Sequence, residues 1–560
     1  MQQTARLHTR PHVLAPRSFE ELLAGGGGAA TVGALRASER SWRLLVVRAL
    51  LDSAATVPTG PLPPLADGWR LLARAHAVSA EAAEAVLAYP AVGVWAAHTL
   101  RRLRGSAEGD TPLWTDTGYL HAIAATAALR AGVDFRTDIP VRHGWAALPA
   151  LGAMRVRGPE DRGVAEVSAT GGCVRIGGRA PEGPDWHPLT ELRADGCVLL
   201  LDDTDPYRSL RKPAVADPLD HAADWQRLFL EAWEILRGTD AEAARALAGG
   251  LVSVVPRPRS ERFRPRSASS GDAFGAAVAS VPDDGEQFAS TLVHEFQHNK
   301  LSAFMHLFTL YDDDQGTGPH YAPWRDDPRP LGGLLQGVYA FFGVTAFWRR
   351  RRHPLGQFEF ALWRSQTAHA LQTISRSEGL TDLGRRLVAE LSGRLEPWQA
   401  EPVDTRALAA AELAVADHRA LWRAYHLGPT GPTGESVLTP RTPARGFDTR
   451  AVLLRWLLAD PEGFDRLRAD PGATVEGARP EDADLVMGRT AEARAAFRTR
   501  IVRGDGDPES WVGLGLAARA EGDPAGAELL AHPHLAMARY AGSDGSADPL
   551  ELGRGPAVRG

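Results

Sequence analysis

Two histidines near the middle of the chain are spaced to bind one metal ion. The string His294-Glu295-Phe296-Gln297-His298 puts them four residues apart, on one face of a helix, so both imidazoles can reach the same ion. Glu295 follows the first histidine and is the candidate general base, because it can take a proton from water on a metal or hold a ligand in place. The alternative is a helix whose two histidines make ordinary polar contacts.

The residues around this motif are those of a buried helix. Asp283, Asp284 and Glu286 supply negative charge where a helix N-terminus favours it. Apolar residues from Phe288 to Met305 supply the faces that pack. His306 lies eight residues beyond His298, ~12 Å along the helix axis, and is too far away to bind the same ion.

A third protein ligand decides the chemistry of such a site, because it sets the charge and the number of open positions. We predict Glu359, which lies in the strongly apolar helical segment from Phe358 to Arg364, where a lone carboxylate is costly unless it is paired or bound to a metal. A glutamate from a later helix completes gluzincin-type sites in the same way. A salt bridge to an arginine such as Arg364 would explain Glu359 without a metal.

Other side chains in the same interval are alternatives for the third ligand. His320 lies in the segment Gly318 to Arg325 and would make a three-histidine site, which iron also accepts. Gln336 and one of the residues Asp312 to Asp314 are the remaining alternatives.

Composition excludes several classes of protein. The chain has 560 residues, 44% of them hydrophobic and 24% charged, which is ordinary for a globular protein with several domains. A net charge of −6 argues against nucleic acid as a partner. Its two cysteines, Cys173 and Cys197, are too few for a four-cysteine zinc site and fit a reducing compartment. We find no signal peptide and no run of about 18 apolar residues, so we predict a cytoplasmic protein without a membrane segment.

The pattern of apolar residues changes along the chain and predicts four regions. Residues 1–150 are expected to be helical, with loops at Gly25 to Gly28 and at Val57 to Pro64. Residues 151–285 are expected to form a small β-rich segment with helix. Residues 286–465 would be the metal-binding helical domain, and residues 466–560 a helical tail. The expected fold class is therefore mainly α, or α+β.

Within the second region, short strands are expected at Val164 to Val167, Cys173 to Ile176 and Cys197 to Leu201. A small-residue strand is expected at Ala273 to Ser280, before the metal helix. The acidic string Asp202 to Asp205 is expected to be a turn, although it could hold a cation. The arginine-rich run Val254 to Ser270 is expected to be a solvated loop that could also contact an acidic peptide or a carboxylate cofactor.

The C-terminal region contains a 34-residue recurrence. Ala493 and Phe497 recur as Ala527 and Ala531, with Trp511 between them, which are tetratricopeptide spacings. Asp507-Pro508 and Asp523-Pro524 are expected to open helices. The match covers about one and a half repeats, so we expect it to pack on the main body. It would dock a partner or a leader peptide, or serve as a plain helical cap.

Four segments together resemble a known family. They are Ser267 to Ser270 (SASS), Leu292 to Leu301 (LVHEFQHNKL), Tyr321 to Pro330 (YAPWRDDPRP) and Gly332 to Gly337 (GGLLQG). They resemble the HExxH-motif domain of actinobacterial gene clusters for ribosomally synthesised, modified peptides, in which the domain occurs alone or fused to a radical-SAM maturase. The resemblance is close over residues 250–400 and looser before them. The chain lacks a radical-SAM cysteine triad, so it resembles the free-standing form.

The resemblance implies an unexpected activity, because some members of this family are iron- and 2-oxoglutarate-dependent peptide β-hydroxylases. Two histidines and a carboxylate form the set associated with non-haem Fe(II), and they leave positions open for the keto acid and dioxygen. A precursor peptide would be the substrate, and a radical-SAM maturase of the same pathway could be a partner. An arginine should pair with the distal carboxylate of 2-oxoglutarate. Arg364 is the first candidate, followed by Arg325 and Arg329.

Two other functions fit the same residues. In a zinc metallopeptidase the same three ligands would hold Zn, and Glu295 would deprotonate the attacking water. In a non-catalytic protein the helical scaffold would dock a maturase or a precursor, with a vestigial metal site. On the residues alone the peptidase is favoured, whereas the family resemblance favours the hydroxylase.

Overall fold

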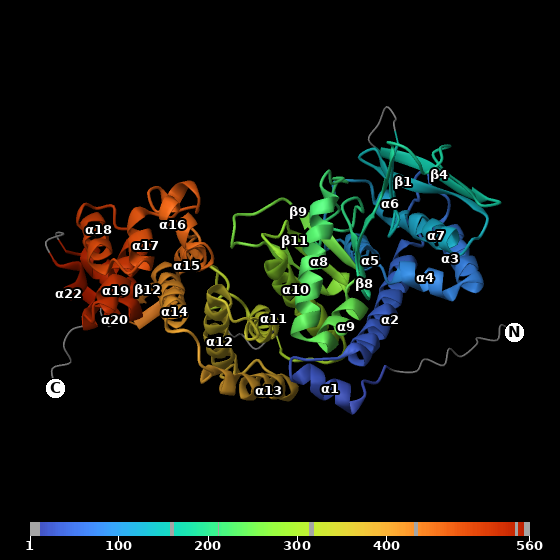
Figure 1. The fold of residues 1–560 in the computed structure, drawn as a ribbon. Coiled ribbons are helices and arrows are strands. Elements are labelled where there is room, and N and C mark those ends of the chain that lie inside the picture. The colour runs from blue at the N-terminus through green and yellow to red at the C-terminus, as the bar shows by residue number, and fades with distance from the viewer. Residues whose placement is uncertain are drawn as a thin grey trace. The chain divides into compact units, whose positions relative to one another are not determined.

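The computed structural model describes residues 12–156, 162–210, 212–312, 318–430, 435–543 and 547–553. Helices predominate in this part of the chain, and the strands form small sheets (Figure 1). The predicted class, mainly helical α+β, is confirmed at this level. The chain divides into two compact units: Met1–Ser260 with Pro265–Phe308, and Glu261–Arg264 with Thr309–Gly560.

The motif His294 to His298 lies in the first unit. The four regions predicted from the sequence place a boundary at residue 286, whereas the division between the units follows Phe308, at the end of the helix that carries the motif. The division into four domains therefore stays a prediction. Each unit is described by itself below.

Helices open the first unit. Their order is α1 (Pro16–Leu23), α2 (Ala29–Ala54), α3 (Leu65–Val78), α4 (Ala80–Leu87), α5 (Pro90–Leu103), α6 (Leu113–Thr117) and α7 (Tyr119–Arg130). The predicted loops at residues 25–28 and 57–64 are confirmed. The helical pattern from residue 80 to residue 103 comprises two helices, because Pro90 begins a new one at the position where its missing N–H costs nothing.

An antiparallel sheet follows these helices, with the strand order β5-β4-β1-β2-β3-β6. The strands are β1 (Phe135–Arg142), β2 (Trp145–Leu148), β3 (Gly152–Arg155), β4 (Arg162–Thr170), β5 (Cys173–Ile176) and β6 (Trp186–Pro188). The strands predicted at residues 164–167 and 173–176 are confirmed. The sheet begins about 15 residues before the predicted boundary at residue 151. The sequence analysis missed β1 because Pro140 lies within it, and proline weakens the pattern of a strand.

A second sheet has the order β10-β11-β9-β8-β7 and lies beside the motif helix. Its strands are β7 (Thr190–Ala194), β8 (Cys197–Leu201), β9 (Ser253–Arg257), β10 (Ser267–Ala268) and β11 (Ala276–Ser280). The strand predicted at 197–201 is confirmed, and the one predicted at 273–280 starts at Ala276. The basic run from residue 254 is not simply a loop: it begins in β9, where Val254 and Val255 are buried between two neighbouring strands, and it ends at β10.

Three helices complete the first unit. They are α8 (Ala222–Thr239), α9 (Ala241–Gly250) and the motif helix α10 (Gly285–Leu307). Figure 1 shows α10 beside β9 and β11, with α8 and α9 nearby. The helix expected within residues 151–285 is present as α8 and α9.

The second unit is largely helical. It contains α11 (Leu331–Trp348), α12 (Pro354–Ile374), α13 (Asp382–Gln399), α14 (Thr405–His426), α15 (Thr449–Ala459), α16 (Pro461–Leu467), α17 (Pro480–Val486), α18 (Thr490–Val502), α19 (Pro508–Ala520), α20 (Pro524–Ala531), α21 (Pro533–Ala541) and α22 (Pro549–Gly553). A hairpin of β12 (Leu427–Thr430) and β13 (Glu435–Leu438) interrupts the stretch that was expected to be helical. The helix starts predicted at Asp507 and Asp523 are confirmed, since each side chain caps its helix.

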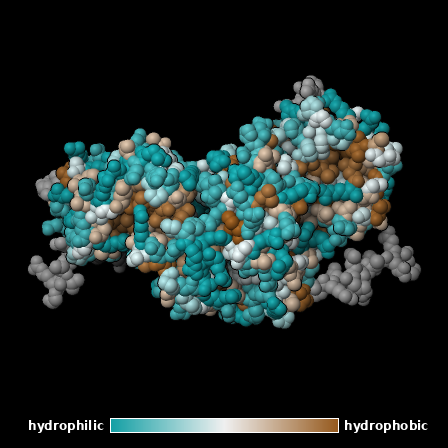
Figure 2. Space-filling model, viewed as in Figure 1, coloured by the Kyte–Doolittle hydropathy of each residue, from teal (hydrophilic) through white to brown (hydrophobic). Residues whose placement is uncertain are grey.

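One described helix, α11, is long and apolar enough to cross a membrane, although the sequence analysis found no such run. About 67% of its 18 residues are buried inside the structure, which is typical of a core helix. The space-filling view shows hydrophilic residues over most of the visible face of each unit (Figure 2). The cytoplasmic location stays a prediction.

The predicted acidic turn at the end of β8 is buried rather than solvated. Asp202 Oδ2 accepts a hydrogen bond from the Tyr89 hydroxyl at 2.5 Å, and Asp202 Oδ1 accepts one from the backbone N–H of Asp205 at 3.0 Å. The Tyr119 hydroxyl donates to Asp205 Oδ2. These bonds tie β8 to the helices around Tyr89 and Tyr119. Burial, and next the charge of Asp202, raise the pKa of Asp205 to about 7.

We predict that Asp205 makes the first unit less stable as pH rises from about 4 to about 7. In this window the folded carboxyl holds a proton that the unfolded chain releases, so the free energy of unfolding falls with pH, and the effect ends above pH 7. Asp205→Asn cannot titrate, so the wild-type minus variant difference in unfolding free energy should decrease across the window. Urea unfolding at several pH values measures it. A pH-independent difference, equal to that of the exposed control Asp220→Asn, would contradict the prediction.

Candidate functional site

Packing on three sides fixes the position of α10 in the first unit. Its N-cap Asp284 accepts a hydrogen bond from the backbone N–H of Gln287, as the acidic residues before the motif predicted. The Phe288 ring packs edge-on against Trp225 of α8, with ring centroids 5.7 Å apart. At the end of α9, a Cβ on Gly250 would lie 2.3 Å from the Phe296 ring, so this close approach requires glycine.

Asn299 joins α10 to the neighbouring sheet. Its Oδ1 accepts a hydrogen bond from the backbone N–H of Gly275 at 2.6 Å, and its Nδ2 donates to the carbonyl of Ala276 at 3.0 Å. Nδ2 also donates to the carbonyl of Glu295 at 2.8 Å, one turn back on the same helix. Asn299 is 2% exposed, so without its side chain the Gly275 N–H and the Ala276 carbonyl would lose a buried partner, at a cost of about 1–3 kcal/mol per group.

His294 and His298 are brought together on one face of α10. Their Nε2 atoms are 3.1 Å apart. With metal–nitrogen bonds of ~2.1 Å, two nitrogens on one ion lie ~3.0 Å apart at a right angle and ~3.4 Å apart at a tetrahedral angle. The observed separation lies between these values, so the pair fits a single ion. His294 is 21% exposed, and burial together with His298 holds its pKa well below the usual value, which keeps the imidazole neutral as a ligand must be.

Glu295 connects the histidine pair to the edge of the second sheet. Its Oε1 lies 3.9 Å from His294 Nε2, and the hydroxyls of Ser267 and Ser269 donate hydrogen bonds to its carboxylate. The side chain is 1% exposed, and its Oε2 has no hydrogen-bond partner among the described residues. Burial raises the pKa of Glu295 despite these hydroxyls. The carboxylate is therefore poised to hold or accept a proton.

A neighbouring side of α10 holds the loop between α1 and α2. Gln297 Nε2 donates to the carbonyl of Gly25 at 3.0 Å, and Lys300 Nζ donates to the carbonyl of Gly26 at 2.7 Å. Gly25 and Gly27 have φ values of 74° and 121°, which favour glycine. Gln297 and Lys300 therefore anchor the motif helix to this loop.

The remaining predicted site residues all lie in the second unit. Glu359 of α12 forms a buried ion pair with Arg455 of α15, with Arg455 Nε 2.5 Å from Oε1, and accepts a hydrogen bond from Trp363 Nε1 at 2.7 Å. The salt bridge considered in the sequence analysis therefore exists, but its arginine is Arg455 and not Arg364. Both carboxylate oxygens have partners within this unit.

The alternative third ligands occupy different elements of the second unit. His320 pairs by its backbone with Arg329, and its Nε2 is buried without a hydrogen-bond partner among the residues described here. Gln336 lies on α11. The backbone N–H of Asp312 donates to the carbonyl of Gly379 at 2.8 Å. Asp313 and Asp314 lie outside the described residues.

The arginines predicted to pair with 2-oxoglutarate already have acceptors. Arg364 Nη1 donates to the carbonyls of Trp398 and Glu401 at 2.8 and 2.7 Å, at the end of α13. Arg325 forms an exposed ion pair with Asp327 at 2.9 Å. Arg329 lies 3.4 Å from the same carboxylate group.

Within the described ranges, no group of three or more His, Cys, Asp or Glu side chains is placed to hold a metal ion. The structure brings His294, Glu295 and His298 together, and the third ligand stays a prediction. Sequence reasoning missed the roles of Asn299, Ser267 and Ser269, although all three fall in segments that carry the family resemblance. A polar residue directly after the motif, and alternate serines before a small-residue strand, are the signals that could have found them.

A comparison with protein-family models and with curated proteins finds no match for this chain.

We predict that Glu359 stabilises the second unit through its ion pair with Arg455. Removing one partner of a buried ion pair leaves the other as an uncompensated buried charge. Glu359→Gln and Arg455→Met should therefore each lower the free energy of unfolding by about 3–5 kcal/mol. Arg455→Met should keep the iron content of the wild type after anaerobic reconstitution. Chemical unfolding and metal analysis measure the two effects. Loss of iron in Glu359→Gln alone would instead establish Glu359 as the third ligand.

Proposed function

We propose that the protein is an Fe(II)- and 2-oxoglutarate-dependent peptide β-hydroxylase that acts on a ribosomally synthesised precursor peptide. The observation that carries the proposal is the 3.1 Å separation of the two Nε2 atoms on one face of α10, which fits one metal ion. The family resemblance across residues 250–400 supports iron with 2-oxoglutarate rather than zinc.

The arrangement around the histidine pair supports a peptide as substrate. β10 is the terminal strand of its sheet, and Ser267 and Ala268 are both exposed. An extended peptide can add to such an edge through backbone hydrogen bonds. Because Ser267 and Ser269 also hold Glu295, a peptide on β10 would run close to the histidine pair. We also propose that this part of the fold is zincin-like. The motif helix lies beside a mixed sheet whose edge strand is short and antiparallel.

In this proposal the chain's own residues position the reaction. Iron with 2-oxoglutarate supplies the oxidising power: one oxygen atom of O₂ enters a C–H bond of the peptide, the other enters succinate, and CO₂ is released. His294 and His298 would hold the metal, with Asn299 fixing their helix. Glu295 would hold a proton beside the site or orient His294. Glu359 as third ligand, and Arg364, Arg325 or Arg329 as the partner of the 2-oxoglutarate carboxylate, stay predictions.

A zinc metallopeptidase is the second candidate, favoured by one observation. Glu295 combines burial, a raised pKa and an oxygen without a partner among the described residues, which suits a general base that deprotonates water. The third candidate, a non-catalytic docking scaffold, would rely on the helices α18 to α20, which we propose as tetratricopeptide-like because of their 34-residue recurrence.

We predict that the protein, purified without oxygen and loaded with Fe(II), forms succinate from 2-oxoglutarate when air is admitted. His294→Ala should abolish this turnover because it removes a metal ligand. Glu295→Gln should retain succinate formation to within about 10-fold, whereas a general base of a peptidase would lose about 10²–10⁴-fold. Succinate is quantified by chromatography, with a peptide library present to detect cleavage.

The matched control is His306→Gln, since His306 lies on the same helix but pairs with Glu39. It should leave turnover unchanged. Cleavage of the library by the zinc-loaded protein, lost in Glu295→Gln and accompanied by no succinate with iron, would replace the hydroxylase with the peptidase. If the protein forms neither succinate nor cleaved peptide and retains no metal, the non-catalytic docking scaffold becomes the favoured function.

A further inference from the structure

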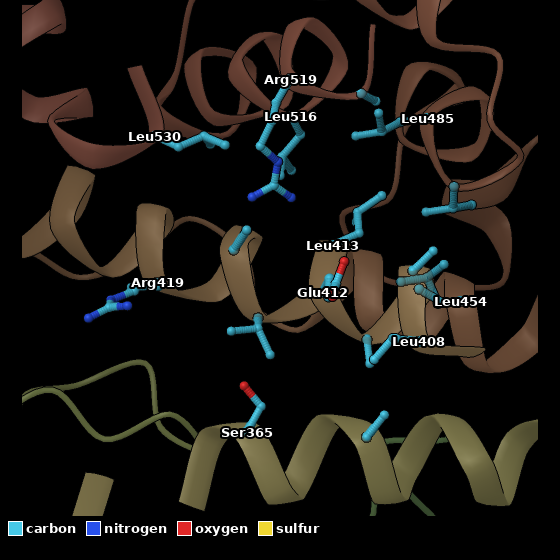
Figure 3. Close-up of a pocket in the computed structure, with 18 of the residues that line it drawn as sticks. Ser365, Leu408, Glu412, Leu413, Arg419, Leu454, Leu485, Leu516, Arg519 and Leu530 are labelled. Atoms are coloured by element: carbon cyan, nitrogen blue, oxygen red, sulfur yellow. The ribbon is translucent and has the colours of Figure 1, made fainter. Parts of the chain in front are cut away.

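The second unit contains a large cavity along α14. Its volume is about 1020 Å³, above the ~300–1,000 Å³ of most small-molecule sites. Residues of α12, α15, α17, α19 and α20 line it together with α14. Figure 3 shows Leu516 and Arg519 reaching in from α19, opposite Glu412 and Leu413 on α14. All of the lining residues belong to this unit.

The walls of the cavity are largely aliphatic. Leucines from several helices face it, so its surface would bury the apolar side of an amphipathic ligand. They are Leu408, Leu413, Leu454, Leu485, Leu516 and Leu530.

Arginines give the cavity an excess of positive charge. Among the described lining residues, five arginines stand against one carboxylate, Glu412; they are Arg364, Arg406, Arg419, Arg423 and Arg519. Arg423 Nη1 reaches the carbonyl of Leu530 at 3.5 Å, and Arg419 Nη2 reaches the His369 ring at 3.2 Å. Within the described part of the chain, Arg419, Arg423 and Arg519 have no carboxylate within 4.0 Å. Burial lowers the pKa of both Arg423 and Arg519, so both guanidiniums are partly desolvated, and the charge of Glu412 only partly offsets this lowering at Arg519.

A second cavity of about 680 Å³ continues the first. The two share Ser365, Gln399, Val415 and Arg419 among their lining residues, so they form one elongated trough. Gln366 lines the second cavity; it is 4% exposed, and its Oε1 has no hydrogen-bond partner among the described residues. A buried amide oxygen without a partner is costly, so it favours a ligand that brings a donor such as a backbone N–H.

We propose that this trough, defined by the two cavities along α14, binds an acidic amphipathic peptide segment. The leucines would bury its apolar residues, and the arginines, spread over α14 and α19, would pair with several carboxylates rather than with one. A fatty acid carries a single carboxylate and would leave most of the guanidiniums uncompensated. That this peptide is part of the substrate rests on the proposed function. Docking itself requires no metal.

The test is direct binding to the full-length protein. The probe is a fluorescein-labelled peptide of about 14 residues built from the heptad Leu-Glu-Glu-Leu-Leu-Glu-Glu, which presents leucines at helical spacing. Fluorescence anisotropy should show saturable binding that weakens with salt. Arg419→Gln and Arg519→Gln should each weaken it by about 10-fold, because each removes a charge partner. The control Arg466→Gln, on α16 outside the trough, should not.

Charge reversal makes the test independent of stability. Arg419→Glu with Arg519→Glu should lose the glutamate peptide and gain binding of a matched lysine peptide, which a merely misfolded variant would not do. His294→Ala should bind the probe normally, so failure of docking and failure of catalysis are distinguishable. Equal binding by trough and control variants would overturn the proposal. So would displacement of the probe by palmitate together with no measurable preference for glutamate over lysine peptides.

Discussion

The side chain of Asn299 is the interaction on which the first unit's site depends. It bonds the start of β11 and the carbonyl of Glu295 at once, so it fixes both the distance and the rotation of α10 relative to the sheet. Rotation matters because the histidine pair occupies only one face of the helix. Since the amide is buried, an apolar replacement would leave the Gly275 N–H and the Ala276 carbonyl without this partner. The position of the histidine pair is therefore set by the residue that directly follows it.

Around this anchor, α10 separates structural from chemical positions by face. Gln297 and Lys300 hold the glycine loop on one side. On the other, Glu295 links the histidines to the edge strand through Ser267 and Ser269. The second unit offers a different kind of surface, a basic apolar trough, whose lining suits an acidic amphipathic peptide.

The sequence predicted local features well and long-range partnerships poorly. The motif helix, its acidic cap and several strands follow from periodicity and capping, which are properties of neighbouring residues. β1 and β9 were missed because a proline in one and flanking arginines in the other obscure the alternation, while cross-strand pairing stabilises both. Glu359 was correctly identified as a buried carboxylate that needs a partner. Its partner Arg455 lies 96 residues away, and no local pattern identifies it.

Metal content tests the central claim most directly, because the claim is that His294 and His298 hold one ion. After anaerobic reconstitution with Fe(II) and removal of excess iron, the account predicts one ferrous ion per wild-type chain. It predicts none in His294→Ala or His298→Ala, and retention in Glu295→Gln. Equal iron content in the wild type and both histidine variants, with all of them folded by circular dichroism, would contradict the account.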